Sequence, residues 1–279
     1  MRNQEIGVRR DFAPRPDWAL GLALAFVLGA VFLTLRANRM ARAMAAIAST
    51  EAAALRVADE LRQSSDDLTR MARAHAATGD ERYLEYFREI LDIRNGDAPR
   101  PRNYHLPYWD LVIPGGEYPR SAGERVAMRS LIEGLASPEG AAVDVMEYSA
   151  IGQRLAARRF DTGIADPEIA LLVASEDASN ALAEREEQAF EAVRAGNRDV
   201  ALDLLHSREY HEGKARVMAP LAGFAETVQD RMRAETEELA GKQRTARRAA
   251  VALVVLSILL IGAGISVLPG REKTGGTPT

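Results

Sequence analysis

Residues 54–75 have the sequence ALRVADELRQSSDDLTRMARAH. Within them, mostly small and apolar residues recur at alternating steps of four and three, a spacing that places them on one face of an α-helix. The series is Ala54, Ala58, Leu61, Ser65, Leu68, Ala72 and His75. A second series at much the same spacing is Tyr210, Lys214, Val217, Leu221, Phe224, Val228 and Met232. Both series predict helices that pack side by side.

Two stretches without a charged residue lie outside these series. They are residues 18–35, WALGLALAFVLGAVFLTL, and residues 249–268, AAVALVVLSILLIGAGISVL. At about 1.5 Å per residue, each is long enough, or nearly so, to cross a hydrocarbon layer of roughly 30 Å. We therefore expect two transmembrane helices in a lipid bilayer. Residues 36–248 then lie on one side, and the tails 1–17 and 269–279 on the other.

The first apolar stretch is expected to stay in the protein as a membrane anchor. Cleavage as a signal peptide at Ala41-Arg42-Ala43 is an alternative, but the apolar stretch is unusually long, and Arg36 and Arg39 lie close to that position. A twin-arginine export signal at Arg9-Arg10 meets the same objection of length. The N-terminal tail carries four arginines, which favours both tails in the cytoplasm. We expect a multi-pass protein of a bacterial inner membrane, with residues 36–248 in the periplasm or outside.

The sequence of the long middle segment, residues 36–248, predicts a series of helices. The first helix is expected to end at Thr78 before Gly79, and the last to run from about Glu209 into the second apolar stretch, with a local cost or kink at Pro220. Asp166 is expected to cap a helix that has Pro167 in its first turn. No strand is predicted. The expected helices between the two ends cover residues 80–94, 122–137, 141–159, 166–195 and 197–207. The predicted fold is all-α and four-helix-bundle-like, with two flanking transmembrane helices.

One long interruption, residues 95–120, separates these helices. Five of the twelve prolines lie in it, so no helix is expected to cross it. Seven of the sixteen Phe, Trp and Tyr residues lie between Tyr83 and Tyr118, which is too aromatic for disorder. A long loop of this kind in a compact domain is usually functional.

Composition excludes several classes of protein. With no cysteine, the chain has neither disulfides nor thiolate metal sites. Its net charge of −4 argues against nucleic-acid binding. Its four histidines lack metal-ligand spacing, and neither a nucleophile elbow nor a phosphate-binding loop is found. We therefore expect no enzyme activity, no cofactor and no metal.

Residues 61–112 resemble the extracytoplasmic sensor module of bacterial membrane receptors, as found in methyl-accepting chemotaxis transducers, sensor histidine kinases and diguanylate cyclases. The resemblance rests on SSDDLTRMAR, TGDERYLEYFREILDIRNG and PRPRNYHLPYWD, with a weaker match at residues 204–224. It implies a homodimeric receptor that senses an extracytoplasmic ligand or partner and passes helix motion through the membrane. Such receptors continue into an output domain, whereas only PGREKTGGTPT follows here. We expect either that a separate signalling protein supplies the output, or that the output half has been lost from the reading frame.

The aromatic segment has two interpretations. As a clasp, its rings cover the open end of the bundle while its arginines bind carboxylates or carbonyls of neighbouring helices. As a pocket, the same residues hold a small polar or anionic ligand. Asp66 and Asp67 form an exposed ion pair with Arg70, or else Asp66 or Thr69 reaches across the bundle to hold the loop or a ligand. The candidate ligand-binding residues are Arg94, Arg100, Arg102, Tyr104, Tyr108, Trp109, Asp110, Asp66 and Arg70.

Two other functions remain open. One is a non-signalling, membrane-anchored interaction or adaptor protein of the cell envelope. The other is a secreted enzyme, which requires cleavage of the first apolar stretch and release from the membrane.

Overall fold

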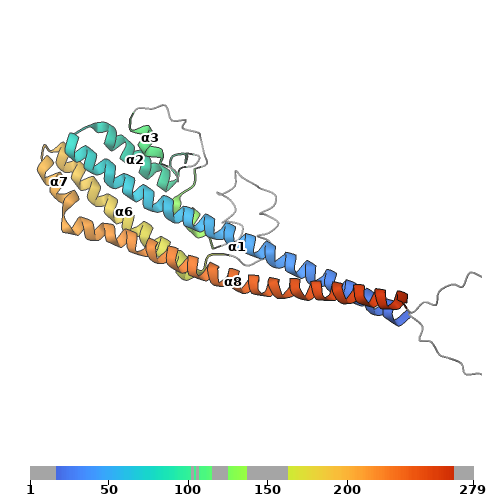
Figure 1. The fold of residues 1–279 in the computed structure, drawn as a ribbon. Coiled ribbons are helices and arrows are strands. Elements are labelled where there is room, and N and C mark those ends of the chain that lie inside the picture. Colours follow the sequence, from blue (N-terminus) through green and yellow to red (C-terminus); the bar gives the residue numbers. More distant parts are fainter. Residues whose placement is uncertain (1–16, 102–103, 105–106, 115–124, 137–162, 267–279) are drawn as a thin grey trace, which may run out of the picture. The chain divides into compact units, whose positions relative to one another are not determined.

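The computed structural model describes residues 17–101, 104, 107–114, 125–136 and 163–266. Within these residues the chain forms helices and no strand, so the all-α prediction is confirmed for them (Figure 1). The helices are α1 (Asp17–Thr78), α2 (Glu81–Asn95), α3 (Tyr108–Val112), α4 (Met128–Gly134), α6 (Asp166–Arg194), α7 (Arg198–His206) and α8 (Arg208–Ser266).

The predicted helix ends agree closely with these bounds. α1 ends one residue before Gly79, whose φ of 71° suits glycine and whose N–H donates to the carbonyl of His75 at 2.7 Å. Asp80 then begins α2, because its carboxylate accepts from the N–H of Arg82 at 3.0 Å. α8 begins at Arg208, one residue before the expected start, and continues through Pro220.

Three local predictions need correction or lie outside the described residues. No helix crosses the described residues of the Pro-rich interruption, as expected, but it contains α3, a helix of five residues that was not predicted. Asp166 does not cap α6; Ala165 precedes the helix with an extended backbone, and the Glu168 carboxylate accepts from its N–H at 2.8 Å. The helix expected at 122–137 is described only as α4, and the one expected at 141–159 lies outside the described residues.

The chain divides into two compact units. We call described residues 17–41 and 238–266 the apolar unit, and described residues within 42–237 the core unit. α1 and α8 each contain residues of both units. These two helices are also long and apolar enough to cross a membrane, as the two predicted spans require.

In the apolar unit, small side chains are buried and large ones are exposed. The buried side chains include Ala23, Ala30 and Ser257, while Leu28 and Phe32 are about 60 % exposed. A Cβ added at Gly29 would lie 3.1 Å from Leu253, so the two helices approach each other closely there. Close approach of small residues is the usual way in which membrane helices pack.

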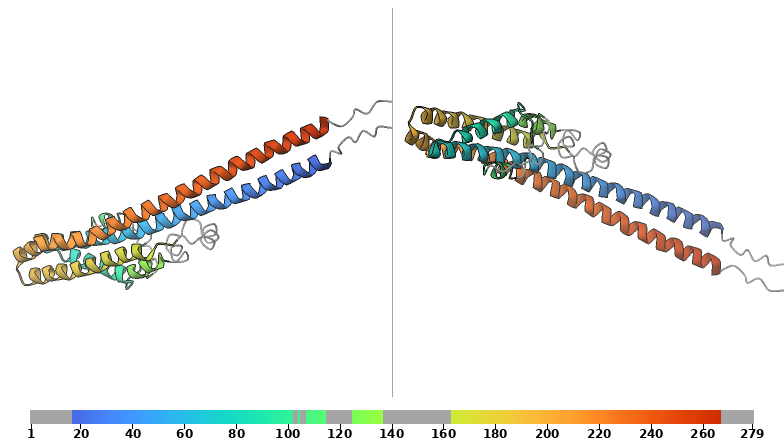
Figure 2. Two further views of the ribbon diagram at one scale, coloured as in Figure 1. Left: turned by 90° about the horizontal axis from the view of Figure 1, so that it is seen from below. Right: turned by 90° about the horizontal axis from the view of Figure 1, so that it is seen from above.

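In the core unit, the two predicted series face inward. Every member of the series from Ala54 to His75 is buried. Every member of the series from Tyr210 to Met232 is buried too, except Lys214, which is partly exposed. α2 and α6 meet beside them, because Phe87 and Phe190 pack edge to face with ring centroids 4.8 Å apart. Figure 2 shows the core-unit parts of α1, α6 and α8 running side by side.

Candidate functional site

The aromatic segment, Tyr104 together with α3, is packed into the core unit. Trp109 and Tyr108 are fully buried, and their rings meet edge to face at 5.1 Å. Trp109 also stacks at a tilt on Tyr86 of α2, at 5.4 Å. Its indole N–H donates to the Tyr104 hydroxyl at 3.0 Å, so the polar ends of both side chains are bonded. Burial raises the pKa of Tyr104, which keeps this hydroxyl neutral.

Two ion pairs join this part of the chain to α1. Arg100 lies 3.1 Å from Glu60, and both side chains are buried. Arg70 binds the carboxylate of Asp110, and at 2.7 Å that of Asp67. Burial is the main cause that raises the pKa of Asp67, to about 6, although Arg70 opposes it.

These pairs correct the expected position of the aromatic segment. Glu60 and Arg70 lie well before the end of α1 at Thr78, so the segment lies along the side of the helices. Figure 1 likewise places α3 beside α2 and away from α7, which lies at the end of the core unit. Arg100 binds a carboxylate of a neighbouring helix, as the clasp interpretation describes, but the three rings are buried along the side of the helices and do not cover their end.

Arg94 of α2 differs from Arg70 and Arg100 because it donates its hydrogen bond to a backbone carbonyl and not to a carboxylate. It is buried, and its Nη2 donates to the carbonyl of Glu176 at 3.5 Å. In the part of the chain that the structure describes, its Nε and Nη1 have no hydrogen-bond partner. Burial lowers the pKa of Arg94 to about 10, against the attraction of Glu176 and Glu186. The Glu176 carboxylate is itself paired with Arg129 of α4 at 2.7 Å.

A layer of polar side chains, buried except for the partly exposed Lys214, crosses the core unit where α1, α6 and α8 meet. We call Ser65, Thr69, Glu186, Tyr210 and Lys214 the polar layer. The Tyr210 hydroxyl lies 2.5 Å from the Glu186 carboxylate and 2.9 Å from the Thr69 hydroxyl. Lys214 donates to the hydroxyls of Ser65 at 2.9 Å and Thr69 at 3.3 Å. Each of the three helices therefore contributes at least one side chain to a single hydrogen-bonded network.

The polar layer reaches the surface through Asp66. Lys214 binds the Asp66 carboxylate at 2.9 Å, and that side chain is 45 % exposed. Asp66 also pairs with Arg62 at 3.0 Å, whereas Arg70 takes Asp67 as its partner. Asp66 thus makes the contact across the bundle that was one of its two interpretations.

Most of the predicted site residues lie in two neighbouring places along α1. Arg100, Tyr104, Tyr108, Trp109 and Asp110 belong to the aromatic segment and its ion pairs. Asp66 and Arg70 lie on α1 between that segment and the polar layer, and Arg94 lies on α2 beside α6. Arg102 lies outside the described residues.

Glu186 is the residue that sequence reasoning missed. It stands in AEREEQAFE, residues 183–191, among three other acids and an arginine, and resembles the exposed face of a helix. Only 1 % of its surface is exposed. The one usable signal is its position four residues before the buried Phe190 and four after the buried Leu182.

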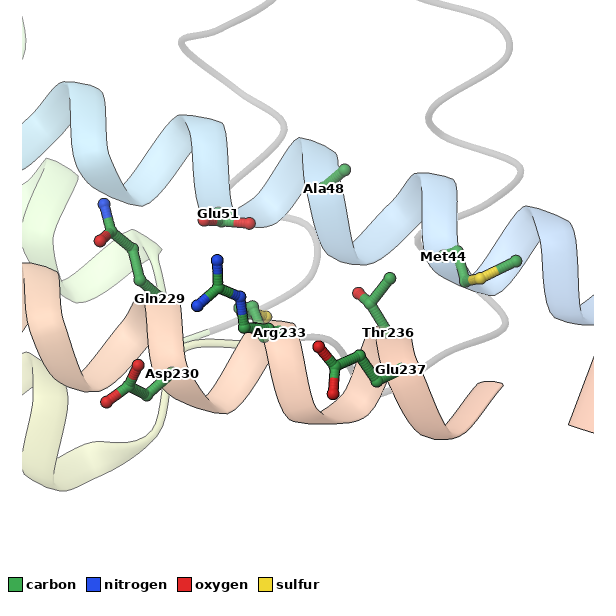
Figure 3. A pocket seen from close by; sticks show the side chains of 9 residues that line it. Met44, Ala48, Glu51, Gln229, Asp230, Arg233, Thr236 and Glu237 are labelled. Atoms are coloured by element: carbon green, nitrogen blue, oxygen red, sulfur yellow. The ribbon is translucent and has the colours of Figure 1, made fainter. Parts of the chain in front are cut away.

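A separate groove of about 500 Å³ lies between α1 and α8 within the core unit (Figure 3). Its walls carry three carboxylates, Glu51, Asp230 and Glu237, and one guanidinium, Arg233. None of the predicted site residues lines it. Among the described residues, no group of three or more His, Asp or Glu side chains is placed to hold a metal ion.

Comparison with protein-family models, with curated proteins and with solved structures finds no match to this chain.

Proposed function

We propose that this chain is a membrane-anchored sensor subunit of bacterial signal transduction. In this proposal α1 and α8 cross the inner membrane through their apolar stretches, and the core unit is a four-helix-bundle-like sensor in the periplasm or outside. The residues that resemble known sensor modules, 61–112 and 204–224, support it, because they include much of the polar layer and the aromatic segment. As in those receptors, the working form is a homodimer.

The polar layer is the observation that carries the proposal. It bonds α1 to α8, and these are the two helices that contain the apolar stretches. Buried polar groups are costly unless every partner is in place, so such a layer favours a few discrete arrangements over continuous sliding. A stimulus that binds two arrangements with different affinity shifts their populations. Because α1 and α8 run unbroken into their apolar stretches, that shift moves one span relative to the other by an ångström or two.

A disulfide reporter tests this coupling in the full-length chain. The Ser257 hydroxyl donates to the carbonyl of Ala23 at 3.3 Å, so cysteines at these two positions report the distance between the spans. The chain has no cysteine of its own, so the pair is the only one present. Thr69→Val removes one hydroxyl from the polar layer while keeping the shape of the side chain. We expect it to change the rate of disulfide formation roughly fivefold in lipid vesicles.

Thr227→Val is the matched control. Thr227 lies on α8, is exposed, and donates only within its own helix, to the carbonyl of Gly223 at 2.7 Å. The proposal fails if Thr69→Val and Thr227→Val leave the same disulfide rate as the unmodified reporter. An unchanged rate would mean that the distance between the spans does not depend on the core unit. That result would favour a static, membrane-anchored adaptor of the cell envelope.

Topology provides an independent test. Reporter proteins fused at Asp110 and at Thr279 are expected to be active outside and inside the cytoplasm, respectively. A cytoplasmic signal from the Asp110 fusion would remove the sensor proposal, since the core unit would then not face the periplasm. Retention of the Asp110 fusion in the membrane also separates an anchored sensor from a secreted enzyme.

A further inference from the structure

We propose that the proton is a ligand of this sensor, bound at Glu186, and that its binding redirects the Tyr210 hydroxyl from α6 to α1. This inference rests on the proposed function and names the stimulus that acts on the polar layer. It is carried by the position of one hydroxyl between two competing acceptors on different helices.

Tyr210 has a single hydroxyl proton and two acceptors within reach. They are the Glu186 carboxylate on α6, at 2.5 Å, and the Thr69 hydroxyl on α1, at 2.9 Å. An ionised carboxylate is the stronger acceptor, so it accepts the hydrogen bond of the Tyr210 hydroxyl when Glu186 is charged. A protonated Glu186 has an O–H of its own and donates it to the Tyr210 oxygen. The Tyr210 proton is then free to be donated to Thr69.

This change alters which helices are joined. With Glu186 charged, Tyr210 ties α8 to α6, and the Thr69 hydroxyl donates to the Ser65 carbonyl at 3.0 Å or to Glu186. With Glu186 neutral, Tyr210 ties α8 to α1. Since α1 and α8 carry the apolar stretches, protonation strengthens a contact between these two helices in particular.

A hydrogen-bonded route connects the buried carboxyl to water. From Glu186 it passes through Tyr210 and Thr69 to the ammonium group of Lys214, and from there to the Asp66 carboxylate. Glu186 and Tyr210 are buried, whereas nearly half of the Asp66 side chain is exposed. Protons therefore have a route to Glu186 that does not require the bundle to unfold.

Charged and polar groups face Glu186 from three other helices. Lys214 and Tyr210 face it from α8, Arg94 from α2, and Thr69 from α1, while Asp66 of α1 binds Lys214. On α1, Arg73 also lies over the Tyr210 ring at 5.3 Å, and His75 packs on Phe190, one turn after Glu186. Lys214 and Arg94 attract the charged form, but burial outweighs them and raises the pKa of Glu186 to about 7.

The direction of the pH effect follows from that raised pKa. Between about pH 4.5 and 7 the folded protein holds a proton on Glu186 that the unfolded chain has already lost. The free energy of unfolding therefore falls as the pH rises through this window. Above about pH 7 both states are ionised at this residue, and the folded protein keeps a constant penalty for the buried charge.

The first experiment follows Glu186 directly in the full-length chain in lipid vesicles. Infrared titration should show a protonated carboxyl band that disappears with a midpoint near pH 7, and Glu186→Gln should remove it. Between about pH 5.5 and 8, the melting temperature of the wild type should fall roughly 5 °C more than that of Glu186→Gln. Equal pH dependence of the two proteins would overturn the proposal.

Asp67→Asn is the matched control. Asp67 is a second buried carboxyl, with a pKa of about 6, but it pairs with Arg70 near the aromatic segment and does not contact Tyr210. If Asp67→Asn abolishes the band near pH 7 and Glu186→Gln retains it, the proton site lies elsewhere.

A second variant keeps the test valid if Glu186→Gln folds poorly. Tyr210→Phe removes the hydroxyl that stabilises the charged form of Glu186, so the midpoint of the carboxyl band should move to higher pH. An unchanged or lower midpoint would show that the two groups do not interact as described.

The disulfide reporter at Ala23 and Ser257 separates this proposal from the receptor proposal. The ratio of disulfide rates, wild type over Glu186→Gln, should be near one at about pH 5.5 and differ roughly fivefold from one at about pH 8. Taking this ratio cancels the intrinsic pH dependence of thiol oxidation. If the ratio is the same at both pH values but Thr69→Val changes the disulfide rate, the proton site is contradicted and the receptor proposal stands. If neither the pH nor Thr69→Val affects the disulfide rate, both proposals are contradicted.

Discussion

The apolar unit and the core unit use the same two helices in opposite ways. In the apolar unit, α1 and α8 bury alanines such as Ala23 and Ala30, and expose large side chains such as Leu24, Leu28 and Phe32. In the core unit, the same helices bury Leu61, Phe224 and other large side chains instead. Under the proposed function this difference has a cause in the solvent, because water drives apolar side chains inward and lipid does not.

The polar contacts between helices also differ between the two units: they are uncharged in the apolar unit and include ionisable groups in the core unit. In the apolar unit, Ser257 and Gln243 donate across to backbone carbonyls of α1, both at 3.3 Å. In the core unit, Glu186 and Lys214 bring ionisable groups into the layer between the helices. Ionisable groups are costly in a lipid environment, so the proposed proton site at Glu186 suits the core unit, which the proposed function places in water.

The largest expected difference between the units concerns their tryptophans. Trp109→Ala removes a fully buried ring from the core unit and is expected to cost about 3 to 5 kcal/mol of unfolding free energy. Trp18→Ala removes a ring that is 63 % exposed in the apolar unit and should change that free energy by less than about 0.5 kcal/mol. Denaturant unfolding of the full-length chain in detergent measures both. Equal costs would mean that Trp109 is not packed as described.

Arginines sharpen the comparison within the core unit. Arg100→Ala removes the buried guanidinium that pairs with the Glu60 carboxylate and is expected to cost about 3 kcal/mol. Arg208→Ala breaks the exposed pair with Glu212 on α8 and should cost less than about 0.5 kcal/mol. The same denaturant unfolding measures both. A cost below about 1 kcal/mol for Arg100→Ala would contradict the clasp and favour a role for Arg100 in binding a ligand.

Exposed leucines test the difference in solvent directly. Leu28→Arg places a charge on the exposed face of the apolar unit, where it is expected to cost about 2.5 kcal/mol of membrane insertion. Leu111→Arg makes the same change on α3, at a leucine that is 48 % exposed in the core unit, and should leave insertion unchanged. The fraction of protein that stays with membranes after an alkaline wash measures this. Similar losses for both variants would argue against the apolar unit as the membrane anchor.

Two buried serines provide the smallest effect. Ser175 of α6 donates to the carbonyl of Val217 at 2.9 Å in the core unit, and Ser257 donates to that of Ala23 at 3.3 Å in the apolar unit. Ser175→Ala is expected to cost about 1 kcal/mol, and Ser257→Ala about 0.6 kcal/mol. Denaturant unfolding at matched detergent concentration resolves the two if each is repeated. A larger cost for Ser257→Ala would reverse the comparison.

Local sequence patterns predicted much of the fold. The two series beginning at Ala54 and Tyr210 correctly identified the buried faces of α1 and α8, because the period of a helix is visible in any window of the chain. Gly79 marked the end of α1 for a similar reason, since a left-handed backbone conformation suits glycine. The two apolar stretches were equally visible. α3 was missed because five prolines in 95–120 outweighed a helix of only five residues.

The candidate site was predictable only in part. The density of aromatic and arginine residues drew attention to Tyr104, Tyr108 and Trp109, and all three proved to be buried. Their location along the side of α1 was not predicted, because it depends on the pairs of Arg100 with Glu60 and of Arg70 with Asp110. Asp66 and Asp67 lie four and three residues before Arg70, and both spacings suit a helical ion pair, so spacing alone did not decide which of the two carboxylates Arg70 binds.

Local sequence was thus enough to place the long helices, their apolar faces, and the two stretches that are apolar enough to cross a membrane. These are properties of neighbours along the chain. Only the tertiary structure decided that Glu186 is buried and shares Tyr210 with Thr69, which lies 141 positions away from that tyrosine. The physical reason is that the cost of burying a charge depends on which distant groups surround it, and the period of a helix does not specify its partners.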